Sequence, residues 1–418
     1  MSAESLSSEP LSAEPPSSAP LHLAVALDGA GWHPAAWREP AARPAELLTG
    51  PYWADLVLTA ERGLLDFVTI EDAHAVQSSR LDGPDERTDQ VRGRLDAVLV
   101  AARVAPLTRH IGLVPTATTT NTEPFHVSKS IASLDYAAAG RAGWRVKVSA
   151  SAHEARLFGR RELPELRVED LADRRVRELI SQLFDEAADH VEVVRRLWDS
   201  WEDDAEIRDA ATGRFIDRDK VHYIDFEGRW FSVKGPSITP RPPQGQPIVT
   251  ALAHTTVPYR FAARAADVVY VTPNDADNAR AIVREIRAEQ AAAGRAAQPL
   301  HVFADLVVFL GETQSEATER KARLDERAGE QYTSDAQIFT GTPGELADLL
   351  LDWQRSGISG YRLRPGTLPD DLAAITGGLV PELQARGAFR RAYEADTLRG
   401  LLGLPRPASR YAAIATGV

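Results

Sequence analysis

The sequence predicts an α/β protein that folds as a (β/α)8 TIM barrel, with an insertion between the fourth helix and the fifth strand. Strand-like and helical segments alternate along the chain without a break in composition, and eight strand–helix units can be counted. Several strand-like runs are apolar at odd and even positions alike, as expected of parallel strands that are covered on both faces. A doubly wound open sheet is the alternative that the same alternation allows.

The predicted strands are short apolar runs, and amphipathic segments separate them. The strands are expected at residues 21–27, 65–70, 110–114, 143–149, 247–252, 267–271, 300–310 and 360–363. The helices are expected at residues 52–62, 94–104, 124–139, 178–201, 257–265, 276–294, 315–327, 344–356 and 369–386. A strand, a helix and a parallel strand form a right-handed crossover unit. The carboxyl ends of the strands should therefore meet at one end of the barrel, which is where ligands bind.

The segment of about residues 202–243 is expected to interrupt this series as an insertion within one domain that spans residues 21–418. The runs VHYIDFEG and RWFSVKGP predict two short strands around Glu227 and Gly228, which is a hairpin signal. Long loops of a barrel usually lie on the active-site face, and a structural flap or a dimer contact is the alternative. The first twenty residues are mostly Ser, Pro, Glu, Ala and Leu, a composition that predicts a disordered tail over residues 1–20.

Composition excludes several classes of function. The net charge of −12 argues against sequence-independent binding to nucleic acid and against docking on anionic membranes. The absence of cysteine excludes disulfides, thiolate nucleophiles and cysteine-ligated metals. None of the ten histidines has the spacing of a zinc-binding helix motif, so no metal site is expected. No apolar run is long enough to cross a bilayer and the first residues do not read as a secretory signal, so we expect a cytoplasmic protein.

Hydroxyl side chains gather at the expected carboxyl ends of the third and fourth strands. Thr116 and Thr118 belong to a threonine-rich stretch at the end of the third strand, and Ser149 lies at the end of the fourth. Hydroxyl groups and backbone amides without a cluster of metal ligands favour a polar organic ligand. Threonine is also common in strands for reasons of packing alone, which is the structural alternative.

The fourth strand alternates between polar and apolar residues. Arg145, Lys147 and Ser149 fall on one face, while Trp144 and the valines fall on the other. We expect the apolar face to pack against the outer helices and the polar face to line the barrel interior. A buried cation needs a partner, which is either a bound ligand or a carboxylate. The candidate carboxylates are Glu71, Asp72 and Glu123.

Five short motifs follow one another between residues 123 and 247. They are EPFH at 123–126, ASLD at 132–135, GRAGW at 140–144, LWDSWEDDA at 197–205 and the run GRWFSVKGP…PRPPQGQP at 228–247. In this order they resemble the bacterial luciferase-like flavin-dependent monooxygenases, and the branch of nitrilotriacetate and dibenzothiophene-sulfone monooxygenases in particular. The resemblance implies a TIM barrel, reduced FMN supplied by a separate flavin reductase, molecular oxygen, a small organic substrate and a homodimer.

The resemblance also implies roles for individual residues of the strand ends. Asp72 takes the position of an aspartate that lies beside the flavin ring, and Thr118 takes that of a small hydroxyl residue. Thr116 and Ser149 belong to the same implied cofactor site. Arg145 replaces an asparagine after GRAGW. We expect its guanidinium to donate hydrogen bonds to the pyrimidine edge of reduced flavin, which carries negative charge.

The phosphate end of the implied flavin site departs from the family pattern. Thr255 takes the place of a serine at the start of the helix after the fifth strand, Pro258 that of a glycine, and Phe184 that of a tyrosine. A helix start binds phosphate, but threonine caps and early prolines are also ordinary helix-start chemistry. Two alternatives therefore stay open: a deazaflavin-dependent oxidoreductase on the same barrel, and a non-catalytic paralogue with a degraded phosphate site. The catalytic base stays unknown among three histidines that follow strands, His33, His74 and His153.

Overall fold

The computed structural model describes residues 21–80 and 83–411, and the tail expected at residues 1–20 lies outside them. Within this part of the chain, eight parallel strands form a ring. The strands are β1 (His22–Leu27), β2 (Phe67–Ile70), β3 (Gly112–Thr118), β4 (Gly143–Lys147), β9 (Ile248–Leu252), β10 (Val268–Val271), β11 (His301–Leu310) and β13 (Gly360–Pro365). Their order is β10-β9-β4-β3-β2-β1-β13-β11, and the pairing of β10 with β11 closes the ring. The predicted barrel is confirmed and the open sheet is excluded.

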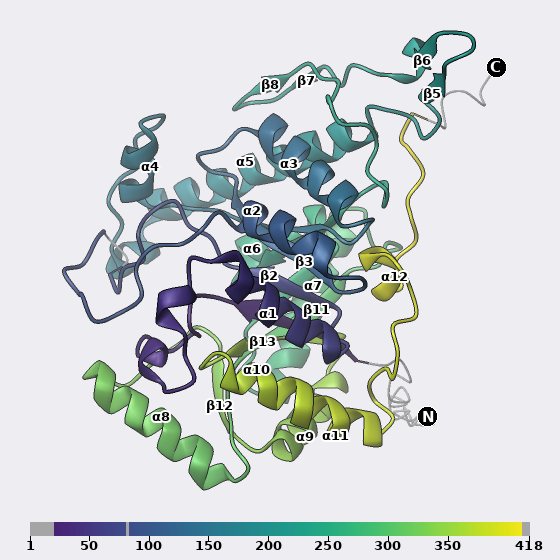
Figure 1. Ribbon diagram of the computed structural model, residues 1–418. Coiled ribbons are helices and arrows are strands. Elements are labelled where there is room, and N and C mark those ends of the chain that lie inside the picture. The colour runs from purple at the N-terminus through teal and green to yellow at the C-terminus, as the bar shows by residue number, and fades with distance from the viewer. Residues whose placement is uncertain (1–20, 81–82, 412–418) are drawn as a thin grey trace, which may run out of the picture.

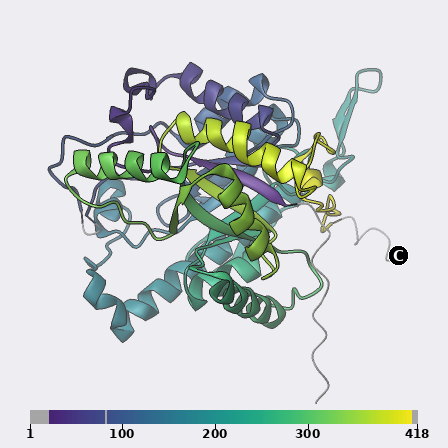
Figure 2. The same ribbon diagram turned by 90° about the horizontal axis from the view of Figure 1, so that it is seen from below.

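Helices surround the ring of strands, as Figures 1 and 2 show. The helices are α1 (Gly50–Arg62), α2 (Ala97–Val104), α3 (Pro124–Ala137), α4 (Ala152–Phe158), α5 (Arg174–Asp199), α6 (Thr256–Ala265), α7 (Ala276–Ala292), α8 (Gln314–Ala328), α9 (Pro343–Gln354), α10 (Asp370–Ala374), α11 (Val380–Ala385) and α12 (Leu398–Leu401). A π-helical segment, η6 (Ile375–Leu379), joins α10 to α11. Short 3-10 turns occur at Ala36–Arg38, Pro44–Glu46, Ala105–Leu107, Val168–Ala172 and Arg218–Lys220. The predicted helices are all present, and α4 and α12 were not predicted.

A further strand, β12 (Gln337–Gly341), was also missed by the sequence analysis. It pairs in parallel with Leu306–Leu310 of β11, whereas β10 pairs with the first residues of β11. The ten-residue strand β11 is thus longer than its neighbour β10, and β12 supplies hydrogen-bond partners to the part that extends beyond β10. Most residues of β12 are only half-buried, so its sequence carries a weak strand signal.

The amino-terminal end of the barrel is closed by the segment that carries α12 (Figure 1). Leu398 and Leu402 pack inside the ring against Phe67 and Phe303 from the strands. A Cβ atom at Gly112 of β3 would lie only 2.6 Å from a methyl carbon of Leu398, so this close approach requires glycine. An apolar plug therefore fills one end of the barrel, and the polar residues of the strands are left for the other end.

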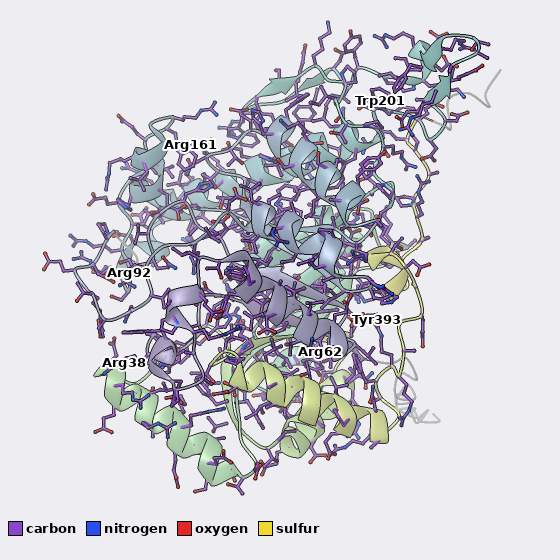
Figure 3. The ribbon with its side chains drawn as sticks, in the orientation of Figure 1. Arg38, Arg62, Arg92, Arg161, Trp201 and Tyr393 are labelled. Atoms are coloured by element: carbon purple, nitrogen blue, oxygen red, sulfur yellow. The ribbon has the colours of Figure 1, made fainter. Side chains whose placement is uncertain are left out.

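The insertion between α5 and β9 forms two small antiparallel sheets. One consists of β5 (Glu206–Asp209) and β6 (Arg214–Ile216), and the other of β7 (Phe226–Glu227) and β8 (Ser232–Val233). The β7–β8 pair confirms the predicted hairpin. Trp201, which Figure 3 labels near β5 and β6, donates its indole N–H to the Ser237 carbonyl. The insertion packs against α5 and Phe125 of α3 through an apolar cluster that includes Ile224 and Phe231.

His190 of α5 is buried between the barrel and this insertion, with Trp144 and Phe231 as ring neighbours. Burial lowers the pKa of its imidazole to about 3. In the unfolded chain, His190 therefore binds a proton below about pH 6.5. In the folded chain it binds this proton only below about pH 3. We expect stability to fall as the pH drops through this window, with a contribution from His190 on the order of 4 kcal/mol.

Urea unfolding at several pH values between 7 and 4 measures this contribution. His190→Leu should lose less stability on acidification than the wild-type chain, because no buried imidazole then resists protonation. His126→Gln is the matched control, since His126 is exposed on α3; it should follow the wild-type pH dependence. If the unfolding free energy of His190→Leu falls with pH as steeply as that of the wild-type chain, His190 is not the source of the pH dependence.

Candidate active site

The six site residues predicted from the sequence lie on one arc of the barrel rim. They come from the carboxyl ends of β2, β3 and β4 and from the start of α6, which follows β9. These four strands are consecutive neighbours in the ring, in the order β9-β4-β3-β2. The residues are Asp72, Thr116, Thr118, Arg145, Ser149 and Thr255. The ring therefore places on neighbouring strand ends residues that are up to 183 positions apart in sequence (from 72 to 255).

Arg145 points into the barrel and forms an ion pair, which is one of the two partners that the sequence left open. Its guanidinium donates to Glu71 at 2.8 Å and to the Thr116 hydroxyl at 3.0 Å. Trp144, its neighbour on β4, packs outward in the helix-facing core, as the alternation predicted. Burial opposes ionisation of Glu71, but the guanidinium groups of Arg145 and Arg362 outweigh it and hold the pKa of Glu71 below its usual range. Burial lowers the pKa of Arg145.

This ion pair is one end of a charged layer that crosses the barrel and is buried except at Asp335. Arg362 of β13 pairs with Glu71 and donates to Asp305 of β11 at 2.9 Å. Arg364 also donates to Asp305, at 3.0 Å, and pairs with Asp335 at 2.6 Å. The guanidinium of Arg362 lies 4.3 Å from the ring centre of Tyr270, a cation–π contact.

The β11 and β13 members of this charged layer were not among the predicted site residues. The alternation of Arg362 and Arg364 in the run GYRLRP carries the same signal as Arg145 and Lys147 in β4, and it could have been read in the same way. The layer holds three guanidinium groups and three carboxylates, so its charges balance. Its members are Arg145, Arg362, Arg364, Glu71, Asp305 and Asp335.

Asp72 fixes the backbone at the rim. Its carboxylate accepts hydrogen bonds from the N–H groups of Ala73, at 2.7 Å, and of Ala97, at 3.0 Å, and so ties the end of β2 to the start of α2. Lys147 donates to the Asp72 carbonyl at 3.0 Å. Burial raises the pKa of the Asp72 carboxyl. Asp72 therefore has a structural role at the rim, beside the flavin role that the resemblance implies.

A cavity of about 310 Å³ lies beside these groups. Asp72, Thr116 and Thr118 line it on the barrel side, and α2 and α3 line it on the other side. His74 also lines this cavity; its ring packs on Phe158 at 4.3 Å, and burial lowers its pKa. The Nδ1 atom of His74 is buried without a hydrogen-bond partner among the described residues.

The other two candidate bases are placed differently. His33 is buried, and both of its ring nitrogens are engaged, by Asp325 at 3.0 Å and by the Ala35 N–H at 3.1 Å. His153 lines a neighbouring cavity at the carboxyl end of β4. Of the three histidines, His74 is therefore the one that combines a place in the cavity with an unengaged ring nitrogen.

The remaining two predicted residues differ in their surroundings. Ser149 is buried, and its hydroxyl accepts a hydrogen bond from the Ser151 N–H at 3.2 Å. Thr255 is exposed at the N-cap of α6, and its hydroxyl makes no capping hydrogen bond. The next residue, Thr256, donates its hydroxyl to Glu285 of α7 at 2.6 Å. Phe184 lies beside Phe261 of α6, with ring centres 5.7 Å apart, and offers no hydroxyl.

Residues 21–80 and 83–411 contain no group of three or more acidic or histidine side chains placed to hold a metal ion. Among the helices in the described part of the chain, none is both long and apolar enough to cross a membrane.

Comparison with known proteins identifies the family. A model of the luciferase-like monooxygenases matches residues 33–360, which is more than half of the chain. The chain belongs to this family. It is 32% identical to nitrilotriacetate monooxygenase component A of Aminobacter aminovorans, over 93% of this chain and 97% of that protein. It is 29% identical to dibenzothiophene-sulfone monooxygenase of Rhodococcus erythropolis, over 89% of this chain and 93% of that protein.

A solved structure extends the likeness to three dimensions. Riboflavin lyase, whose crystal structure holds modified FMN and riboflavin, superposes on this monooxygenase with a TM-score of 0.79 and 26% identity, over 94% of this chain and 98% of that chain. The family, the branch and the class of flavin-dependent monooxygenase that the sequence predicted are confirmed. Because these relatives are enzymes, the reading as a non-catalytic paralogue is set aside.

Proposed function

We propose that the chain is the oxygenase component of a two-component monooxygenase, which binds reduced FMN over the carboxyl ends of β2, β3, β4 and β9. The observation that carries this proposal is that the six predicted residues lie at or after four neighbouring strands of the ring, and that one of them, Arg145, is anchored in the charged layer. The relative from Aminobacter is named a component A, which supports a separate reductase. The riboflavin lyase structure, with its modified FMN, supports this cofactor rather than a deazaflavin.

The residues at the ring end of the proposed site fit a reduced flavin. Arg145 is buried, and both of its hydrogen bonds, to Glu71 and to Thr116, come from Nη1. Its Nε atom has no hydrogen-bond partner among the described residues, so the guanidinium keeps donors for the negatively charged pyrimidine edge. Lys147 adds a second cation on the same face of β4. Thr116 and Thr118 supply hydroxyl groups that can bond to the carbonyl and N–H groups of the ring.

The start of α6 fits a phosphate less well. Since the Thr255 hydroxyl makes no capping bond, it and the first N–H groups of the helix are available to a ligand. Glu285, however, accepts from Thr256 at 2.6 Å and brings a negative charge beside this helix start. We therefore expect the ring to contribute more of the binding free energy than the phosphate does.

A bound reduced flavin supplies the electrons with which molecular oxygen is activated. The protein's part is to hold the ring and to position a substrate. The cavity of about 310 Å³ beside Thr116 and Thr118 has the size of a small organic molecule. His74, whose pKa is lowered by burial, is neutral at neutral pH and can accept a proton from a molecule in that cavity.

Anaerobic fluorescence titration with reduced FMN tests the proposed function, followed by measurement of oxygen consumption with a flavin reductase. Arg145→Gln should weaken the binding of reduced FMN by about tenfold, the worth of one hydrogen bond to a charged group. Oxidised FMN should be affected less, because its pyrimidine edge is neutral. The matched control is Arg284→Gln, since Arg284 is exposed on α7; it should bind both forms as the wild-type chain does.

The outcomes of this titration separate the claims. Equal affinity of Arg145→Gln and wild type for reduced FMN would remove Arg145 from the flavin site, whereas failure of the wild-type chain to bind any flavin would overturn the proposed function. A deazaflavin titrated in parallel distinguishes the alternative cofactor. The homodimer implied by the resemblance stays a prediction, which light scattering on the eluted protein tests.

A further inference from the structure

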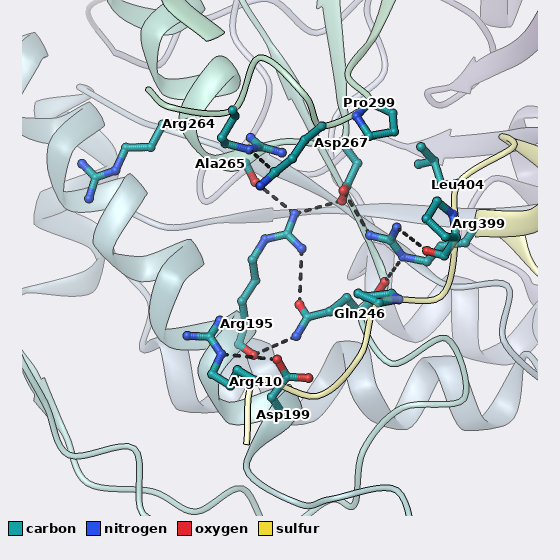
Figure 4. Close-up of a pocket in the computed structure, with 14 residues that line it drawn as sticks. Arg195, Asp199, Gln246, Arg264, Ala265, Asp267, Pro299, Arg399, Leu404 and Arg410 are labelled. Atoms are coloured by element: carbon teal, nitrogen blue, oxygen red, sulfur yellow. Dashed lines mark hydrogen bonds and ion pairs between the residues drawn. The ribbon is translucent and has the colours of Figure 1, made fainter. Parts of the chain in front are cut away.

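A second cavity, of about 450 Å³, lies at the opposite end of the barrel from the proposed flavin site (Figure 4). Three of its lining residues, Gln246, Asp267 and Pro299, lie one or two positions before β9, β10 and β11 and therefore mark the amino ends of these strands. The other walls come from α5 and from the segment that begins with α12. Nothing in the proposed oxygenase reaction uses this cavity.

Arginine dominates the lining of this cavity. Five arginines and only two acidic residues line it, and the guanidinium of Arg264 points away from the others (Figure 4). The arginines are Arg195, Arg264, Arg295, Arg399 and Arg410, and the carboxylates are Asp199 and Asp267. The lining therefore carries a net charge of +3, although the whole chain carries −12. A concave surface with charge of one sign concentrates the electric field and attracts counter-ions.

Both carboxylates of the lining are already shared between two cations. Asp267 accepts from Arg195 at 2.9 Å and from Arg399 at 3.1 Å, and Figure 4 shows both guanidinium groups converging on it. Asp199 pairs with Arg410 at 3.3 Å and with Arg241 at 3.0 Å, but Arg410 also pairs with Glu192 and Arg241 with Asp203. The surplus of positive charge therefore lies at Asp267, which two arginines share.

Arg295 contributes a cation with no acidic partner. It donates to the carbonyls of Ala263, at 2.8 Å, and Ala266, at 3.1 Å, at the end of α6, and to the side-chain oxygen of Gln298 at 2.6 Å. Among the described residues it forms no ion pair. Burial, followed by repulsion from Arg195, lowers its pKa. An anion in the cavity would relieve this repulsion and neutralise the surplus charge.

We propose that this cavity binds the phosphate group of a small molecule. Planar guanidinium groups match phosphate oxygens with paired N–H donors, and several of them converge here from different elements. The volume exceeds that of a phosphate ion and lies in the range of small-molecule sites, which favours a phosphorylated metabolite over the free ion. Because Arg399 and Arg410 belong to the C-terminal segment and Arg195 to α5, a ligand here would fasten that segment to the barrel.

Isothermal titration calorimetry at constant ionic strength tests the proposal, with glycerol 3-phosphate and inorganic phosphate as probes and chloride as the reference anion. The wild-type chain should bind glycerol 3-phosphate with a Kd below about 1 mM, and saturation should raise the melting temperature by about 1–2 °C. Arg295→Gln should weaken binding at least tenfold. Arg284→Gln, which removes an exposed cation from α7 outside the cavity, should bind as the wild-type chain does.

The relative affinities of the two probes show whether the cavity takes a phosphorylated metabolite or the free phosphate ion. Tighter binding of glycerol 3-phosphate supports a phosphorylated metabolite, and tighter binding of inorganic phosphate supports the free ion. If Arg295→Gln does not fold, Arg264→Gln takes its place. Arg264 is half exposed, and among the described residues its only ion pair is a 3.6 Å contact with Asp189. We then expect Arg264→Gln to bind glycerol 3-phosphate several-fold more weakly than the wild-type chain. The proposal is overturned if the wild-type chain does not bind glycerol 3-phosphate or phosphate at 10 mM, about tenfold above the expected Kd. It is also overturned if the wild-type chain and the variants bind these probes equally.

Discussion

Asp305→Asn should lower the free energy of unfolding by about 3–5 kcal/mol. Asp305 is fully buried on β11 and accepts hydrogen bonds from Arg362 and Arg364, two guanidinium groups that are also buried. Asparagine keeps the size of the side chain but removes its charge, so two cations stay in the barrel interior without their shared counter-ion. Removing one partner of a buried ion pair is costly because the remaining charge has lost its solvent and gained nothing in return.

Urea unfolding at neutral pH measures the loss, and Asp335→Asn is the matched control. Asp335 pairs with the same Arg364, but its side chain is 43% exposed. Water can therefore compensate for its removal, and we expect a loss below about 1 kcal/mol, as for a surface ion pair. A similarly small loss of unfolding free energy for both variants would mean that water reaches the charged layer and solvates the arginines.

The charged layer explains why Arg145 is held where a flavin ring can use it. Its guanidinium is anchored by Glu71, and Glu71 in turn is anchored by Arg362. A side chain with several anchors loses little further conformational entropy when a ligand binds, which favours binding. The layer thus positions a cation for the cofactor, whatever its net effect on the stability of the fold.

The barrel was predictable from the sequence because strand and helix periodicities are local signals. The elements that were missed are short or exposed. The helix α4 has only seven residues, although Ser151 and Glu154 carry the spacing of a helix-capping pair, and the Ser151 hydroxyl does cap the helix. The strands β5 and β6 are short, and none of their residues is buried, so no apolar alternation marks them.

The site was predictable only in part, because contacts between distant strands are set by closure of the ring. Alternation along β4 was enough to place Arg145 inside the barrel. It could not choose among three carboxylates as the partner, since Glu71 is 74 positions away in sequence. The pairing of Arg362 with Asp305, 57 positions apart, likewise follows from the adjacency of β13 and β11, which no local pattern encodes.

Gly31→Ala should also destabilise the folded chain by about 3–5 kcal/mol, through the loops at the rim rather than through charge. Gly31 follows β1 and has φ +125°, a conformation that residues with a Cβ atom rarely adopt. A Cβ atom there would lie 2.5 Å from the Gly366 carbonyl oxygen and 2.7 Å from Thr367 Cα, both in the backbone after β13. Neither atom can turn away as a side chain can, so the two loops must separate.

The separation should also reach the proposed flavin site. The N–H groups of Trp32 and His33 donate to the carbonyls of Pro365, at 2.9 Å, and Gly366, at 3.0 Å, and Trp32 covers the guanidinium of Arg364 at 4.7 Å. Moving the loops would break these contacts and admit water to the charged layer.

Gly93→Ala isolates the steric part of the Gly31→Ala effect. Gly93 also has a positive φ, +89°, but a Cβ atom there would have no described atom within 4 Å, so backbone strain of about 1–2 kcal/mol is the whole expected cost. Urea unfolding of both variants gives the comparison, and titration with reduced FMN gives the functional readout. Equal losses for the two variants would show that strain alone acts and that the loops after β1 and β13 can part without cost. In that case the loops over the charged layer would be deformable, and only β2, β3 and β4 could hold the flavin ring in a fixed position.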